Sequence, residues 1–198
     1  MTPTGTSRRS GTRAAETAAR KIRLLAAASA LAREGGYDAV QMRDVASRAE
    51  VALGTLYRHY SSKDQLLLAA MLHQTELLRA RIEAHPPTAT SPADRVSDVL
   101  QRACRALERE PRVTAALVSA MFSTDPDAID MKRAVGEQLQ GIIARAVDGD
   151  GAADVDVEAV VEVLGGVWLS TLALWAGGLT DAATMASRLD RAAHLVLD

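Results

Sequence analysis

The sequence is short of aromatic residues and of cysteine, and each shortage narrows the class of protein. Phe, Trp and Tyr make up 3% of the 198 residues, although 48% of the residues are hydrophobic. The core must therefore be built from Ala, Leu and Val. Ala and Leu favour helices, and no long alternating β pattern is present. The single cysteine, Cys104, excludes a disulfide within the chain and fits a reducing compartment. The sequence thus predicts an all-α protein of the cytoplasm.

The sequence offers no clear segment for export or for crossing a membrane. The N-terminus is polar and basic, without the apolar core of a signal peptide. The apolar run at residues 157–164 is too short and too interrupted to span a bilayer. We therefore expect no membrane partner.

Motifs of enzymes and metalloproteins are also missing. Cys104 stands on an apolar helical face without a nearby His motif, which favours a small buried hydrophobe. A glycine-rich phosphate loop and a nucleophile elbow are absent. The acidic run at 148–154 lacks the closing glutamate of a calcium loop and predicts a solvated turn. The histidines show no metal-binding spacing: His59, His73, His85 and His194. We expect no catalytic residue, no metal site and no cofactor.

Charge is distributed unevenly along the chain. The formal net charge of −2 does not suggest a nucleic-acid partner. Residues 1–63, however, carry 11 Lys and Arg against 5 Asp and Glu, whereas residues 64–198 carry 12 against 20. This asymmetry is typical of a DNA-binding head on a body that avoids DNA. An architectural protein that binds DNA without sequence preference would carry positive charge along the whole chain.

Two short helices joined by a tight turn are predicted at residues 42–49 and 53–59. In the first, apolar residues recur at helical spacing, and the small Ala46 allows a second helix to cross closely. The second helix has a basic and aromatic outer face, which suits insertion into a DNA major groove. An ordinary helical hairpin with a solvated face is the alternative at any single charged position.

The run LGTLYRHYSSKDQL, at residues 53–66, resembles the end of the DNA-binding domain of the TetR family. In that family Thr-Leu-Tyr precedes an aromatic residue and then Ser-Lys-Asp/Glu-x-Leu. Gly36-Tyr37 and Val45-Ala46 also stand where the family has Gly-Tyr and Ile-Ala. The resemblance implies a TetR-like fold of nine or so helices, with an N-terminal three-helix helix-turn-helix domain. It also implies a C-terminal helical domain that binds an effector and forms a homodimer through the last two helices.

We divide the chain into three parts. Residues 1–13 are Ser-, Thr- and Gly-rich with arginines, which predicts a disordered basic arm. This arm is either a solubilising tail or a contact to phosphates and the minor groove. The helix-turn-helix domain follows at 14–62, and the effector-binding and dimerisation domain at 63–198. Outside the two short helices, we predict helices over 14–34, 62–83, 92–109, 113–122, 126–147, 155–176 and 181–197.

The resemblance implies particular contacts to a double-stranded, roughly palindromic DNA operator. The residues that match phosphate-contacting or DNA-reaching positions of the family are Tyr57, His59, Lys63 and Arg43. Thr55 is a further contact candidate, and Gly54 lets the backbone approach DNA closely. We assign base reading to Arg58, because a guanidinium can bind guanine O6 and N7 together. Glu50 replaces the usual turn glycine, and a left-handed conformation there would cost about 1 kcal/mol.

A closer resemblance links the chain to the actinobacterial TetR-type repressors of steroid (cholesterol) catabolism. It rests on the runs EGGYDAVQMRDVASRAEVALGTLYRHY, RALEREPRVTAAL and VWLSTLALWAGG. That subgroup responds to a CoA thioester of a steroid acid, which implies a large apolar effector such as a steroid or an acyl-CoA. Methionines and a few large aromatics can line an adaptable cavity, although plain helix-bundle core is the alternative for most of them. The residues predicted to line the effector site are Met71, Cys104, Leu117, Met121, Phe122, Trp168 and Leu172.

The sequence therefore predicts a transcriptional repressor that a small apolar effector releases from DNA. The effector should shift the helix over 62–83 and change the spacing of the two heads. It can do so only by binding the DNA-incompetent state more tightly. A TetR-like activator and a drug-responsive efflux regulator remain as alternatives.

Overall fold

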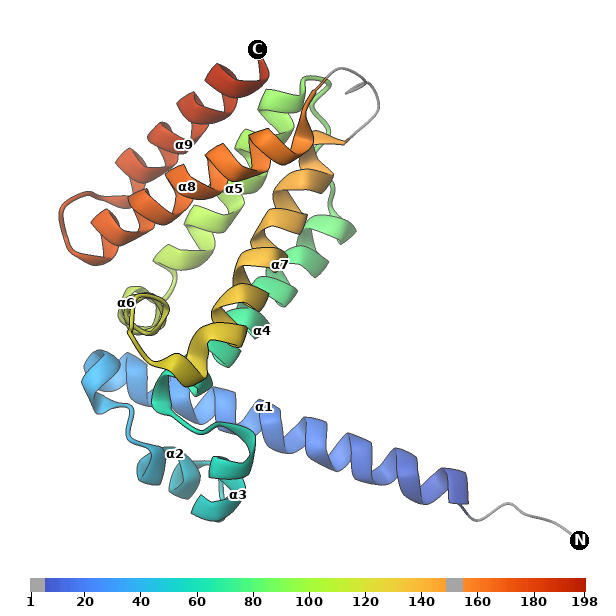
Figure 1. The fold of residues 1–198 in the computed structure, drawn as a ribbon, viewed down its shortest axis with the longest axis vertical. Helices are drawn as coiled ribbons and strands as arrows, with labels where there is room; N and C mark the ends of the chain where they lie inside the picture. The colour runs from blue at the N-terminus through green and yellow to red at the C-terminus, as the bar shows by residue number, and fades with distance from the viewer. Residues whose placement is uncertain (1–5, 149–154) are drawn as a thin grey trace, which may run out of the picture.

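The computed structural model describes residues 6–148 and 155–198, which form an all-α fold as predicted (Figure 1). The elements are α1 (Thr6–Ala39), α2 (Met42–Arg48), α3 (Leu53–His59), α4 (Lys63–Ala84), α5 (Pro92–Glu108), α6 (Pro111–Met121), the 3-10 helix η1 (Pro126–Ala128), α7 (Ile129–Val147), α8 (Val157–Ala176) and α9 (Ala182–Leu197). From α2 to α9 these bounds fall within a few residues of the predicted ones. Of the predicted linker, residues 149–154 lie outside the described residues.

The first helix differs from the prediction at its start. The structure has helix from Thr6, so residues 6–13, predicted as a disordered arm, continue α1, and residues 1–5 lie outside the described residues. Once the Ala-rich helix that follows has formed, each residue added at its start gains a hydrogen bond without a new nucleation step. At its other end, the predicted break is confirmed: Gly35 (φ −144°, ψ 22°) and Gly36 (φ 70°, ψ −157°) leave helical geometry before a last turn.

The helices form a head and a body joined by α4. In Figure 1, α2 and α3 lie at the far end of the molecule from α9, against the C-terminal part of α1. Helix α4 starts in the head and packs in the body against α6 and α7. Helix α5 packs on α9 and α7, and α8 packs on α9 and α7. The N-cap Ser62 accepts a hydrogen bond from the Gln65 amide (3.1 Å) and thereby starts α4 where the sequence predicted.

The core is built from small and aliphatic side chains, as the composition required. The largest fully buried side chains are mostly leucines: Leu24, Leu56, Leu66, Leu67, Leu68, Leu164, Leu172 and Leu189. A buried arginine, which the sequence did not reveal, holds two helix ends together. The Arg95 guanidinium donates to the carbonyl oxygens of Thr90 (2.6 Å), Ala146 (2.9 Å) and Val147 (3.0 Å). It thus satisfies carbonyls at the C-terminus of α7 with a positive charge.

Helix α8 is the most apolar element of the body. Taken whole, its 20 residues are long and apolar enough to cross a membrane, unlike the shorter run at 157–164 that we judged from sequence. Core helices of soluble proteins pass the same test, and it is the one such helix in the part of the chain that the structure describes. Only 33% of its most apolar stretch is buried within the chain. Much of the apolar surface of α8 is therefore free to pack against another molecule.

Candidate DNA-binding face and effector cavity

The turn between α2 and α3 fixes how the two helices cross. Val45, Ala46 and Leu56 are buried between them. After α2 the chain reverses through Glu50, whose φ of 54° is left-handed, as its position in place of a glycine suggested. The Val51 amide then donates to the Ala46 carbonyl (2.9 Å) and closes the turn. This geometry leaves the outer face of α3 on the surface of the head.

Two arginine contacts join α1 to α2. The Arg23 Nε atom donates to the Ala49 carbonyl (3.3 Å) at the end of α2. The Arg48 guanidinium binds both carboxylate oxygens of Glu34, at 2.6 and 3.2 Å, and this hydrogen bonding lowers the pKa of Glu34. These two contacts therefore hold α2 against α1.

The outer face of α3 is open where the sequence predicted contact with DNA. Tyr57 is 50% exposed, and Arg58 and Gly54 are also exposed. A Cβ atom added at Gly54 would meet no atom within 4 Å, so the space in front of its backbone is free. The Arg58 guanidinium donates to the half-buried Thr55 hydroxyl (2.8 Å), which orients it along the same face. Arg43, at the start of α2, is exposed as well.

His59 lies among basic side chains at the end of α3. Partial burial lowers its pKa, and the charges of Lys21, Arg20 and Arg58 lower it further. At neutral pH the imidazole is therefore neutral and can donate one N–H to a phosphate. Because Lys21 and Arg20 of α1 lie close enough to act on His59, the basic surface continues from α3 to α1.

Lys63 is held at the start of α4 by an aromatic residue of the head. Its ammonium lies 3.7 Å from the ring centroid of Tyr37 and donates to the Tyr37 carbonyl (3.3 Å). The Tyr37 hydroxyl in turn donates to the buried carboxylate of Asp64 (2.5 Å). Burial and this hydrogen bond raise the pKa of Tyr37. The sequence did not reveal this clamp, which fixes the beginning of α4 to the end of α1.

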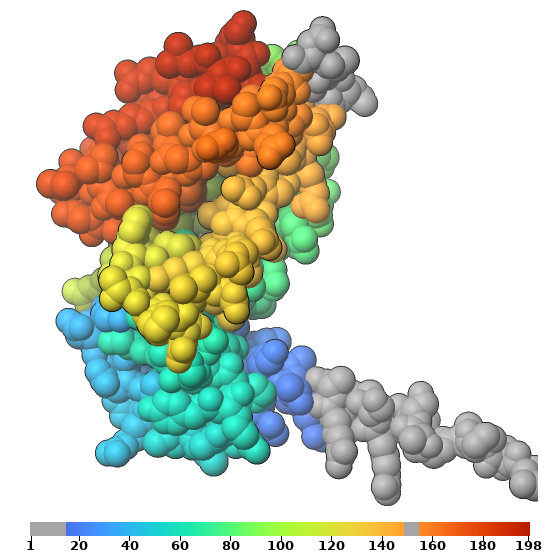
Figure 2. Space-filling view, in the orientation of Figure 1, coloured from blue at the N-terminus to red at the C-terminus, as the bar shows by residue number. Residues whose placement is uncertain are grey.

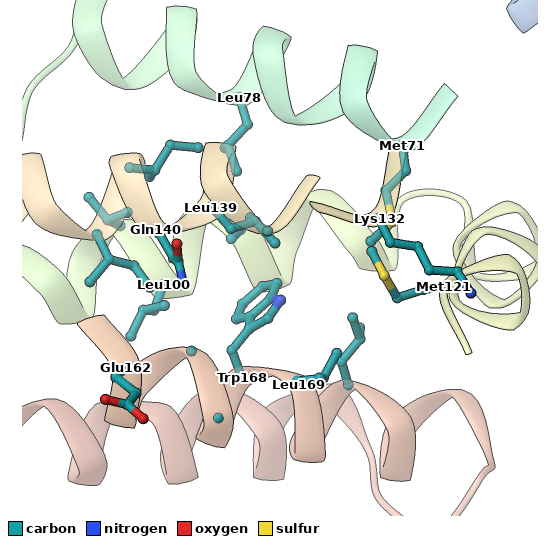
Figure 3. A pocket seen from close by; sticks show the side chains of 18 residues that line it. Met71, Leu78, Leu100, Met121, Lys132, Leu139, Gln140, Glu162, Trp168 and Leu169 are labelled. Carbon is teal, nitrogen blue, oxygen red and sulfur yellow. The ribbon is translucent and has the colours of Figure 1, made fainter. Parts of the chain in front are cut away.

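The body contains a largely apolar cavity of about 330 Å³. This volume is within the range of small-molecule sites. Figure 3 shows side chains of α4, α7 and α8 converging on it, with Met121 from the end of α6. The cavity is lined by Met71, Leu78, Val99, Leu100, Ala103, Met121, Lys132, Gly136, Leu139, Gln140, Ile142, Ile143, Glu162, Gly165, Gly166, Trp168, Leu169 and Leu172.

Four of the seven residues predicted for the effector site line this cavity, and three do not. Those that line it are Met71, Met121, Trp168 and Leu172. Cys104 and Leu117 are buried in the core outside its lining. Burial raises the pKa of the Cys104 thiol to about 11, so it stays protonated at neutral pH. Phe122, directly after α6, is 50% exposed and does not line the cavity either.

The sequence prediction missed the polar lining of the cavity. Lys132, Gln140 and Glu162 join the apolar residues, and the Lys132 ammonium donates to the Ser123 carbonyl. Lys132 could have been predicted from the sequence, because helical spacing places it on the same face of α7 as Gly136 and the apolar lining residues. No group of His, Cys, Asp and Glu side chains suited to a metal ion exists within residues 6–148 and 155–198.

Asp127 connects the wall of the cavity to the head. It lies in η1, within the segment between the lining residues Met121 and Lys132. Its carboxylate accepts a hydrogen bond from the Ser61 hydroxyl (3.0 Å), and its carbonyl accepts one from the Gln65 side chain (3.4 Å). Figure 2 shows this segment, in yellow, against the teal region around the start of α4. A change at the cavity wall thus has a direct route to the end of the DNA-binding unit.

A helix-turn-helix head with an open basic helix, carried on a helical body with an apolar cavity, defines a DNA-binding transcriptional regulator. Residues 24–70 match the bacterial regulatory proteins of the tetR family, and residues 89–196 match the tetracyclin repressor-like C-terminal domain. The chain therefore belongs to the TetR family.

Three known proteins illustrate the similarity. The HTH-type transcriptional repressor KstR of Rhodococcus jostii (strain RHA1) is 38% identical over 178 residues, covering 90% of this chain and 82% of that protein. The crystal structure of a TetR transcriptional regulator from Rhodococcus sp. RHA1 has a TM-score of 0.81 and 31% identity, covering 92% and 97%. FadR of Thermus thermophilus, a TetR-family repressor solved with lauroyl-CoA, shares the fold with a TM-score of 0.71 and 20% identity, covering 89% and 93%. The KstR match confirms the resemblance to the actinobacterial steroid-catabolism repressors.

Proposed function

We propose that this protein represses transcription as a homodimer on a palindromic operator and that a large apolar effector releases it. The observation that carries the proposal is the hydrogen-bonded connection through Asp127 between the effector cavity and a head with an open α3 face. A cavity connected to a DNA-binding head in this way allows a bound ligand to change how the head contacts DNA. The identity to a repressor across head and body supports the same conclusion.

Helix α3 is proposed to enter the major groove and read the operator. Arg58 reads a base, while Tyr57 and His59 bind phosphates, with Arg43 at the start of α2. Gly54 supports this placement because the space before its backbone is open. Lys63 is also proposed to bind a phosphate, which its ammonium would reach from its place beside the ring and carbonyl of Tyr37.

A second copy of the chain is proposed to cover α8 and α9. Large apolar side chains are exposed on or between these helices: Val163, Leu169, Leu179 and Leu195. Leu195 is 85% exposed and Leu179 is 78% exposed, which is costly for side chains facing water. A symmetric dimer through these helices would bury them and present two copies of α3 to the two halves of a palindrome.

The effector is proposed to be a large apolar molecule, with a steroid and an acyl-CoA as the candidate classes. The apolar walls support such a ligand, and the fold is shared with a FadR solved with lauroyl-CoA. Met71 and Leu78 of α4 line the cavity, so the ligand would touch the helix that starts in the head. A ligand that prefers a different position of α4 would change the spacing of the two α3 helices.

The alternatives are two other kinds of regulator and an enzyme. A TetR-like activator would use the same head and cavity but raise transcription when bound. A drug-responsive efflux regulator would respond to drugs rather than to a steroid or an acyl-CoA. An enzyme with a cysteine nucleophile is disfavoured, because the Cys104 thiol is buried and protonated. For any of these regulators the expected compartment is the cytoplasm.

Deletion of the gene, followed by measurement of transcripts, tests repression directly. We expect transcripts next to bound sites to rise in the deletion strain. We also expect purified protein to lose those DNA fragments when steroid or acyl-CoA is added. A fall in these transcripts would favour the activator, and release by drugs but not by a steroid or an acyl-CoA would favour the efflux regulator.

A further inference from the structure

One polar atom in the wall of the cavity has no partner within the protein. The Nε1 atom of Trp168 is buried, and no acceptor among the described residues lies within hydrogen-bonding distance. The whole residue is only 6% exposed and lines the cavity. Buried indole N–H groups usually have an acceptor. This donor is therefore available to a molecule in the cavity.

The indole nitrogen is turned toward one end of the cavity. Figure 3 shows the Trp168 ring projecting from α8 into the middle of the cavity, with its nitrogen turned toward the side where Lys132 and Met121 lie. Glu162 and Gln140 lie toward the other side of the same view. Lys132 adds a second N–H donor at the indole end, where its ammonium already donates to the Ser123 carbonyl. The indole N–H and the Lys132 ammonium thus both lie on the side of the cavity that faces α6 and the start of α7.

We propose that Trp168 selects effectors that carry a carbonyl or hydroxyl oxygen on their apolar body, with that oxygen at the α6 end of the cavity. The oxygen accepts the indole N–H, while the aliphatic walls cover the hydrocarbon. A hydrocarbon of the same shape would fill the cavity and leave the donor without an acceptor. This inference rests on the proposed effector function and adds to it the feature that distinguishes one apolar ligand from another.

The position of this oxygen also places it close to the connection with the head. Met121 and Lys132 bound the segment that carries Asp127. A ligand oxygen at the indole end therefore lies beside the part of the wall whose movement reaches Ser61. Ligand selection and the response of the head would then occur at the same end of the cavity.

Matched probe pairs test the inference: a decalone with decalin, and a dodecanone with dodecane. Within each pair the carbon skeleton is the same and only the ketone oxygen differs. We expect each ketone to bind the full-length protein roughly fivefold to a hundredfold more tightly, as expected for satisfying one buried donor. Trp168→Phe should remove this preference while keeping hydrocarbon binding.

The indole proton provides a second measurement on the same samples. The chain contains two tryptophans, so ¹⁵N-labelled protein should give two indole signals, and Trp168→Phe assigns them. The ketone, but not the hydrocarbon, should move the Trp168 proton to lower field. Trp175→Phe is the matched control, because Trp175 does not line the cavity, and it should keep the preference.

Equal binding of ketone and hydrocarbon would overturn the inference, as would a preference that survives in Trp168→Phe. Failure of every probe to bind would also overturn it. Operator binding measured on the same protein separates these failures from a failure of the regulatory function. If the protein binds its operator and a hydrocarbon without discrimination, the regulator stands and the role of Trp168 does not.

Discussion

In the proposed regulator, recognition of individual bases would depend on very few side chains of the head. Among the candidates on α3, Arg58 combines exposure with a guanidinium that the Thr55 hydroxyl orients (2.8 Å). We propose a corresponding role for the indole of Trp168 in the body, where its buried N–H donor lies in the wall of a largely apolar cavity. Single substitutions of these residues should therefore change what the protein binds without preventing it from folding.

Arg58→Ala should relax the base preference without preventing dimerisation. Loss of a bidentate contact to guanine should reduce discrimination at one position of each half-site by about 1–3 kcal/mol. Binding of operator variants, measured by fluorescence anisotropy, checks this. Lys63→Ala is the contrast, because loss of a phosphate contact should weaken all sequences alike. Unchanged discrimination in Arg58→Ala would remove it from base reading.

Glu50→Gly should stabilise the protein. Glu50 is exposed and left-handed, with φ 54°, so its side chain causes strain that a glycine would relieve. We expect the free energy of unfolding in urea to rise by about 1 kcal/mol. Ser47→Gly, at an exposed helical position in α2, should instead lower it by about 0.5–1 kcal/mol. A loss of stability in Glu50→Gly would show that the turn is not strained.

Among the helices, the response of the head should pass through η1 as well as α4. The Ser61 and Gln65 side chains bind Asp127, which ties the start of α4 to the wall of the cavity. The clamp of Tyr37 on Asp64 holds the same end of α4 against α1. The start of α4 is thus held by η1 and by α1, and a ligand that moves it would have to change both sets of contacts.

Asp127→Ala should weaken the coupling between effector and DNA. Without its carboxylate the Ser61 contact is lost, so a ligand in the cavity should release the operator less completely. Operator affinity without ligand should change little. Asp130→Ala is the control. The Asp130 side chain is 95% exposed and pairs with Arg133 of the same helix (2.9 Å), so its loss should not affect the contact with the head. Full release from the Asp127 variant would exclude this route.

Apart from the start of α1, the sequence was sufficient for the elements but not for the contacts between them. Helix ends were predictable because glycines, prolines and capping serines mark them, as Ser62 and Gly35 show. The pair Tyr37–Asp64 joins residues 27 positions apart, and Ser61–Asp127 joins residues 66 apart. Such contacts leave no periodic pattern. For the same reason, periodicity placed Cys104 and Leu117 on apolar faces but could not show that those faces point away from the cavity.

At the scale of the whole molecule, the exposed apolar face of α8 and α9 defines the proposed dimer. The sequence indicated that α8 has excess apolar surface, and the structure shows which side chains stay uncovered within one chain. A monomer presents only one α3 helix, so dimerisation and affinity for a palindrome should be lost together.

Val163→Glu should convert the protein to a monomer. Val163 on α8 is 49% exposed, and a carboxylate there would be buried without a partner in the dimer. Sedimentation should show half the mass, and operator affinity should fall by at least about tenfold. Leu77→Glu makes the same chemical change on α4, where Leu77 is 45% exposed, and should leave the mass unchanged. A dimeric Val163 variant would place the interface elsewhere.

The most direct test of the account is selection of DNA fragments from the genome with purified protein, followed by sequencing of what is retained. The account predicts one enriched motif with two inverted half-sites, whose spacing matches two α3 helices on successive major-groove faces. Weak binding of all fragments with no enriched motif would contradict sequence-specific repression and leave only the fold and the cavity.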